Sequence, residues 1–154
     1  MTSKQPTARR STCLAIKRVY APPAAGDGTR ILVDRLWPRG LRKDRAKVDI
    51  WLKDIAPSDA LRRRVHANPD AWDAFEVDYA RELGMEPAAS AAQSLLERIR
   101  QGPVTLLYAA RDEARNNASV LKRWLEARRA RAPRRRQVAA TRRARGKKAK
   151  PSKG

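Results

Sequence analysis

The side chains that could do chemistry gather at the ends of two apolar runs. The first run, RILVDRL at 30–36, leads into the loop WPRG at 37–40, and the second, VTLLYAA at 104–110, is followed by Arg111 and Asp112. Apolar runs rich in β-branched residues that stop at Pro, Gly or charged residues are typical of buried strands. Because α/β proteins place their sites at the carboxyl ends of strands, we expect a site where these two runs end.

Two carboxylates at these ends are the candidates for general acid or base chemistry. Asp34 lies near the end of the first run and Asp112 follows the second. Partial burial at a strand end shifts the pKa of a carboxylate, as such catalysis requires. The alternative is that Asp34 forms a salt bridge and Asp112 caps the helix that follows.

Three cations in the same region predict an anion pocket. Arg35 and Arg39 offer planar forks of N–H donors that match phosphate or carboxylate, and Lys53 adds a point charge. The alternative is that Arg35 pairs with Asp34 or Asp112 and only holds the two loops together.

Four further residues are candidates for contacts with a ligand. Trp37 could stack against it, whereas the other tryptophans are interpreted as core residues. The phenol of Tyr108 could donate a hydrogen bond, although a tyrosine in an apolar strand is more often part of the core. Asn116 and Asn117 could bond the loops of the site or satisfy nearby backbone groups.

The elements that must position these groups alternate between strand and helix. A first strand is expected over 13–20, before the two apolar runs, and the segment 41–55 fits neither period. Capping and turn residues place four helix starts. These are Ser58, Asn68 with Pro69, Pro87 and Asp112. The pattern predicts a small α/β domain, with a short, mostly parallel sheet flanked by helices and the two apolar runs paired in parallel.

Net charge divides the chain into three parts. The formal charge is +20, but residues 128–154 hold thirteen Arg or Lys and no acid, and residues 19–127 sum to only +2. We therefore expect a flexible leader at 1–12, one domain at 13–127 and a disordered Arg/Lys/Ala-rich tail at 128–154. The tail could bind DNA or RNA without sequence preference through counterion release, or simply solubilise the protein.

The single cysteine, the single histidine and the lack of long apolar stretches limit the kind of site and the cellular compartment that we expect. Cys13 and His66 are the sole residues of their types, which excludes an intramolecular disulfide and disfavours a usual metal site, and no cofactor motif is present. No window approaches a membrane helix or a signal sequence, so a cytoplasmic protein with no membrane partner is expected. The sequence does not specify an oligomeric state.

Three blocks identify a family resemblance. RILVDRLWPRG, WLKDIAPSDALR and GPVTLLYAARDEARNNASVL occur in this order, and the chain from about 16 to 127 resembles the YeaO-like subgroup of domain-of-unknown-function family 488. The resemblance implies a compact α/β domain and no settled activity. Larger members carry a Cys- and His-bearing motif where this chain has residues 108–117, which contain neither. The resemblance therefore transfers no redox or nucleophilic role to those residues.

Two functions of different classes follow. The first is a small domain that binds or acts on an anionic small molecule at the carboxyl ends of 30–36 and 104–110. The second is a nucleic-acid-associated protein that uses its basic tail for affinity. Whether the first is an enzyme is left open by the sequence.

Overall fold

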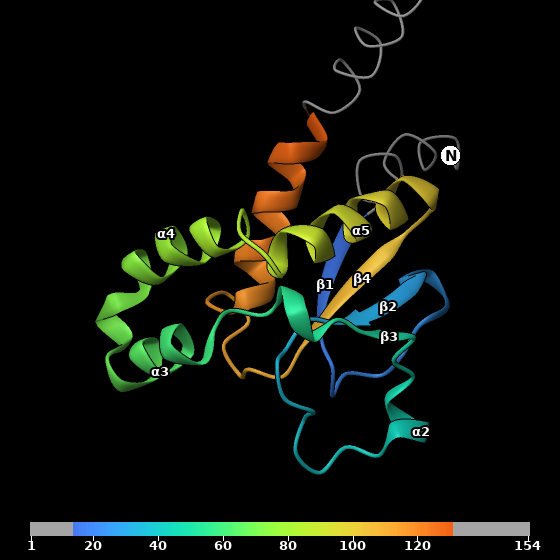
Figure 1. The fold of residues 1–154 in the computed structure, drawn as a ribbon. Coiled ribbons are helices and arrows are strands. Elements are labelled where there is room, and N and C mark those ends of the chain that lie inside the picture. Colours follow the sequence, from blue (N-terminus) through green and yellow to red (C-terminus); the bar gives the residue numbers. More distant parts are fainter. Residues whose placement is uncertain (1–13, 131–154) are drawn as a thin grey trace, which may run out of the picture.

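Four parallel strands in the order β1-β4-β2-β3 form the sheet of residues 14–130, the part of the chain that the computed structural model describes (Figure 1). The strands are β1 (Leu14–Arg18), β2 (Thr29–Leu32), β3 (Ile50–Trp51) and β4 (Val104–Tyr108). The predicted α/β class and the parallel pairing of the two apolar runs are confirmed, since Ile31 lies opposite Leu106 in the ladder. β4 is central, which explains why all five of its residues are buried.

Helices lie beside and between the strands. They are α2 (Lys43–Ala46), α3 (Asp59–Ala67), α4 (Trp72–Glu82), α5 (Ala88–Gln101) and a last helix over residues 117–130. Short 3-10 turns are η2 (Ala25–Asp27), η3 (Lys53–Ile55) and η4 (Pro69–Ala71). In Figure 1, α3 and α4 form a hairpin that extends to one side of the sheet, and α5 lies across the sheet.

The caps decide where the helices begin. Ser58 caps α3 as predicted, because its Oγ accepts the Leu61 N–H at 3.2 Å. Asn68 caps the η4 turn that leads into α4, with its Oδ1 3.1 Å from the Asp70 nitrogen. The expectation that Asp112 caps the last helix is wrong. Asn116 does so, since its Oδ1 accepts the Ser119 N–H at 2.8 Å and the Ser119 Oγ accepts the Asn116 N–H at 3.4 Å.

The two faces of the sheet are covered differently. Alternate residues of β2 and the residue after it, Ile31 and Val33, join the large core cluster under the helices. Leu32 and Leu107 point to the opposite face, where they pack with Trp37 and Trp51. The second face is therefore covered by the loop after β2 and by the Trp51 side chain of β3. This explains why segment 41–55, which contains α2, β3 and η3, fits neither a helical nor a strand period.

Both apolar runs give shorter strands than the predicted 30–36 and 104–110. The ladder continues one residue past β2, where the Val33 N–H donates to the Leu107 carbonyl at 3.1 Å. The next N–H of the partner, that of Ala109, donates instead to the Asp34 carboxylate at 3.0 Å. A side chain thus takes the place of a backbone acceptor, and the strands end there.

The described part of the last helix runs to residue 130, past the predicted domain boundary at 127. The expected leader at 1–12 and most of the expected tail lie outside the described residues.

Candidate functional site

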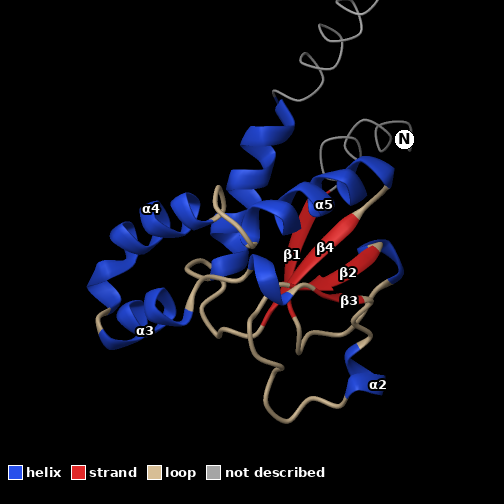
Figure 2. Cartoon of the chain, in the orientation of Figure 1, coloured by secondary structure: helices blue, strands red, loops and turns tan. Residues whose placement is uncertain are grey.

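β2 and β4 end side by side, at the edge of the sheet where the loops collect (Figure 2). Asp34 lies two residues after the end of β2. Its Oδ2 accepts the Ala109 N–H at 3.0 Å, and its backbone carbonyl accepts the indole N–H of Trp51 at 2.8 Å. The Asn117 amide donates to the neighbouring Val33 carbonyl at 3.0 Å. Asp34 is half-buried, so this carboxylate is both held in place and withdrawn from water.

Burial sets the protonation of Asp34. Loss of water raises the pKa of its carboxyl group above the usual value. The Ala109 N–H, the Asn117 amide and the charge of Arg62 act in the opposite direction without cancelling the effect of burial. Asp34 therefore keeps its proton to a higher pH than an exposed aspartate does.

Tyr79 lies behind this carboxylate and belongs to the core. It is fully buried, and its hydroxyl donates to the Ile55 carbonyl at 2.6 Å. Burial raises the pKa of Tyr79 strongly, and the charges of Asp34 and Glu82 raise it further. Its hydroxyl is thus a fixed donor that anchors η3 beside the site.

Two arginines from different elements converge on one carboxylate. Arg35 Nε lies 3.9 Å from Asp59 Oδ1, and Arg62 Nη2 lies 3.3 Å from the same oxygen. Arg35 Nε also donates to the Pro57 carbonyl at 3.4 Å. Arg62 Nε is buried and has no acceptor among residues 14–130. The sequence had offered Asp34 or Asp112 as the partner of Arg35, and the structure gives Asp59.

A contact between α4 and the cap of α3 positions Asp59 and Arg62. Glu82 at the end of α4 accepts both the Ser58 N–H at 2.9 Å and the Ser58 hydroxyl at 2.7 Å. Ser58 in turn caps α3, whose first turn carries Asp59 and Arg62. Sequence reasoning did not identify Asp59 or Arg62 as site residues. The sequence does contain a signal for this pair, since Asp59 directly follows the Ser58 cap and Arg62 lies three residues after Asp59, at the spacing of neighbours on a helix.

The aromatic and cationic candidates of the loop lie elsewhere on this edge. The Trp37 indole donates to the Leu41 carbonyl at 2.7 Å, and its ring meets that of Trp51 edge to face at 5.3 Å. Lys53 Nζ lies 4.3 Å from the centre of the Trp51 ring. Arg39 is exposed, and among residues 14–130 its side chain makes no ion pair. Among residues 14–130, no hydrogen bond or ion pair links Arg35, Arg39 and Lys53 through a shared partner.

The candidates in and after β4 do not all reach Asp34, although the Asn116 amide donates to the Asp112 carbonyl at 2.9 Å. Tyr108 is buried, which raises the pKa of its phenol, and the charge of Glu113 raises it further. Asp112 is exposed and accepts the N–H groups of Ala114 and Arg115, both at 2.9 Å, which lowers its pKa. In the described part of the chain no hydrogen bond or ion pair joins the side chain of Asp112 to that of Asp34. Asn116 is occupied as a helix cap, whereas Asn117 does reach the site.

A second polar cluster, which sequence reasoning missed, lies around the start of β2. Asp27 Oδ1 lies 2.8 Å from Lys17 Nζ, and Asp27 Oδ2 lies 2.6 Å from Arg30 Nη1. Arg30 and Asp27 are both buried. All three side chains are mutually satisfied, which is the mark of a structural network.

The described residues form neither a cluster of metal ligands nor a membrane-spanning helix. Within residues 14–130, no three His, Cys, Asp or Glu side chains lie close enough together to hold a metal ion. His66 is exposed on α3. Among the described helices, none is both long and apolar enough to cross a membrane.

Known proteins resemble this chain over most of its length. A family model described as "Inactive DUF488-N3 subclade" matches residues 13–142. The Mycobacterium tuberculosis protein called Uncharacterized protein Rv3073c is 42% identical over 119 residues, which cover 77% of this chain and 98% of that protein. Uncharacterized protein YeaO of Escherichia coli is 41% identical over 109 residues, or 71% of this chain and 93% of that protein. No solved structure matches.

Proposed function

Because this chain belongs to the inactive DUF488-N3 subclade, a YeaO-like group, we propose that its folded domain binds a small anionic molecule and does not convert it. The site is the arginine pair, Arg35 and Arg62, together with Asp34 and Asn117 at the carboxyl ends of β2 and β4. The word "inactive" in the description of the matching family favours binding over turnover.

One observation carries the proposal, namely that two guanidinium groups share the single carboxylate of Asp59. A guanidinium has five N–H donors in a planar fork, and Asp59 Oδ1 faces only one nitrogen of each. Both side chains are about one-third exposed, at 35% for Arg35 and 36% for Arg62, so solvent and solutes reach part of each guanidinium, although Arg62 Nε itself is buried. An anion with several oxygens would accept from both arginines at once.

The chemistry of the pair favours phosphate or carboxylate as the bound group. Both groups present oxygens at the spacing of the guanidinium fork. Asp34 tunes the affinity, because its ionised form repels an anion and its neutral form does not. Since burial raises the pKa of Asp34, we expect binding to strengthen as the pH falls through that pKa.

General acid or base catalysis by Asp34 and Asp112 is the less favoured alternative. Such a pair must face one substrate, and Asp112 is exposed in a turn that its own carboxylate stabilises. Asp34 alone could still move a proton, but neither His nor Cys is present near it in the block from 108 to 117.

The test uses inorganic phosphate as the probe, with calorimetry and thermal shift on the full chain. Arg62→Gln should weaken phosphate binding about tenfold or more, because a hydrogen bond to a charged group contributes about 1.5–3 kcal/mol. Arg63→Gln is the matched control, since Arg63 is the exposed neighbour on α3. Equal binding by both variants, or no binding by the unchanged protein between pH 5 and 8, would refute the proposal.

A second function, non-specific association with nucleic acid, rests on the segregation of charge. Residues 128–154 carry thirteen cations and no acid, although most of them lie outside the described residues. Each neutralised phosphate releases a counterion, so engagement of about half of these cations gives a log–log salt slope of roughly −6 on B-DNA. A salt titration on two unrelated duplexes, with the full chain and a form ending at 130, tests this. Equal binding by the shortened form, or preference for one duplex, would place recognition in the folded domain.

A further inference from the structure

A small pocket opens between α5 and the β2–β3 side of the sheet, away from the arginine pair. It has a volume of about 130 Å³ and is lined by Ile31, Ile50, Leu52, Ser94, Leu95 and Arg98. We propose that this α5–β3 pocket binds a short aliphatic carboxylate, with the hydrocarbon chain on the aliphatic floor and the carboxylate at Arg98.

The floor of the pocket is aliphatic because of strand and helix periodicity. Ile31 of β2 and Leu95 of α5 are fully buried and form its base. Ile50 of β3 and Leu52, the residue after this strand, alternate with Trp51, so both side chains lie on the α5 side of the sheet. Both are half-buried, and a hydrocarbon chain placed between them would remove their remaining apolar surface from water.

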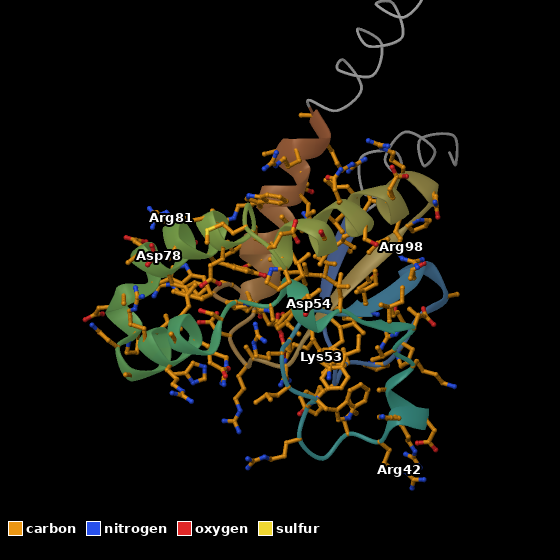
Figure 3. All side chains as sticks on the ribbon, viewed as in Figure 1. Arg42, Lys53, Asp54, Asp78, Arg81 and Arg98 are labelled. Atoms are coloured by element: carbon orange, nitrogen blue, oxygen red, sulfur yellow. The ribbon has the colours of Figure 1, made fainter. Side chains whose placement is uncertain are left out.

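The rim of the pocket is polar on the α5 side. Ser94 and Arg98 are four residues apart on this helix, which places them on the same side, and both are exposed. Arg98 makes no ion pair with any of residues 14–130, whereas its neighbour Arg100 pairs with Glu97 at 3.1 Å. Figure 3 shows Arg98 projecting from α5 on the side of β2. A hydroxyl and an uncommitted guanidinium together form a carboxylate-binding rim.

Size limits the ligand further. A cavity of about 150 Å³ accommodates a benzene molecule, so this pocket of about 130 Å³ has room for a chain of roughly four or five carbons. A neutral hydrocarbon would leave Arg98 unused, and acetate would leave the floor uncovered. The combination points to a branched or straight carboxylate such as 3-methylbutanoate.

The experiment is a titration of the full chain with sodium 3-methylbutanoate, followed by methyl and amide chemical shifts. We expect saturable shifts at Ile50, Leu52 and Leu95, and about tenfold weaker binding for the uncharged 3-methylbutanamide. Acetate should bind more weakly than 3-methylbutanoate.

Two variants of α5 separate this site from a general effect of charge. Arg98→Gln should lose about tenfold in affinity, whereas Arg100→Gln, the matched control on the same helix, should bind as the unchanged protein does. Arg62→Gln should also bind normally, because the arginine pair is a different site. Equal affinity for the acid and the amide, equal losses in the Arg98 and Arg100 variants, or shifts confined to residues outside the pocket would each overturn the proposal.

Discussion

Asp27→Asn should be among the most destabilising polar substitutions in the domain. The Asp27 carboxylate bonds Arg30 at 2.6 Å, Lys17 at 2.8 Å and the Ala24 N–H at 2.9 Å. The side chains of Asp27 and Arg30 are only 9% and 6% exposed. The substitution leaves the buried Arg30 guanidinium without its ion-pair partner at the start of β2.

The loss of unfolding free energy depends on whether the former partners of Asp27 keep other hydrogen bonds or regain water. Removing one partner of a buried ion pair costs about 3–5 kcal/mol. Arg30 keeps its bonds to the carbonyls of Lys47 and Ala46 at 2.8 and 3.0 Å, and Lys17, with 24% of its side chain exposed, regains water. The lower end of that range, about 3 kcal/mol, is therefore expected.

The pH dependence of this effect has a definite sign. Burial alone would raise the pKa of Asp27, but its bonds to Lys17, Ala24 and Arg30 outweigh burial and lower that pKa below 3.8. The carboxylate therefore stabilises the folded state above pH 3.8, and this contribution is lost as the pH falls from there through the folded pKa. The difference between the unchanged protein and Asp27→Asn should shrink accordingly in acid.

Urea unfolding at pH 7 measures the effect. With a slope of about 1.5 kcal/mol per molar urea, 3 kcal/mol lowers the midpoint by roughly 2 M. Asp44→Asn is the control, because the Arg42–Asp44 pair has side chains 74% and 66% exposed and should matter little. Replacing Asp27 by Leu together with Arg30 by Met should destabilise less than Asp27→Leu alone. A loss of under about 1 kcal/mol for Asp27→Asn would show that this network behaves like a surface pair and would refute the reasoning.

Two further substitutions test the carboxyl edge and the helical core. Asp34→Asn should raise the melting temperature at pH 7. Because the pKa of Asp34 is raised in the folded state, its contribution to stability is full below pH 3.8 and is lost as the pH rises through the folded pKa. The melting temperatures of the variant and the unchanged protein, measured from pH 3 to 8, should therefore converge in acid, and a constant difference between them would contradict this. Trp72→Ala should cost about 3 kcal/mol in urea unfolding, the lower end of the range for a core tryptophan, because the half-buried indole stacks on Phe75 at 4.8 Å and donates to Glu76 at 2.8 Å. Glu76 also accepts from Arg123 of the last helix at 2.8 Å, so a loss below 1 kcal/mol would mean that α4 is not held through this indole.

The sequence predicts best where one residue pattern decides the structure. Val104–Tyr108 is a continuous apolar run, and only a central strand of a parallel sheet buries every residue of such a run. Ser58 is likewise a local signal, since the cap and the N–H that it accepts lie three residues apart. These features needed no information from distant parts of the chain.

Features that depend on distant partners could not be predicted in this way. Trp37 and Trp51 cover the second face of the sheet because each indole N–H finds a carbonyl, at Leu41 and Asp34 respectively. The periodicity of apolar residues in the sequence does not predict such hydrogen bonds. The cap at Asn116 was missed because Asp112 has an equally suitable side chain and is satisfied by its own turn.

The candidate site illustrates both situations at once. Asp34 and Arg35 could be located from sequence because they end a recognisable strand, and parallel pairing brings them to the end of β4. Arg62 could not, because it reaches them only when Glu82 holds Ser58 and so fixes the start of α3 against α4. It follows that Glu82 positions Arg62 indirectly, through Ser58 and the first turn of α3. Arg62 and Asp34 would then lose their relative positions if that one carboxylate were removed, even though the sheet that carries Asp34 stayed intact.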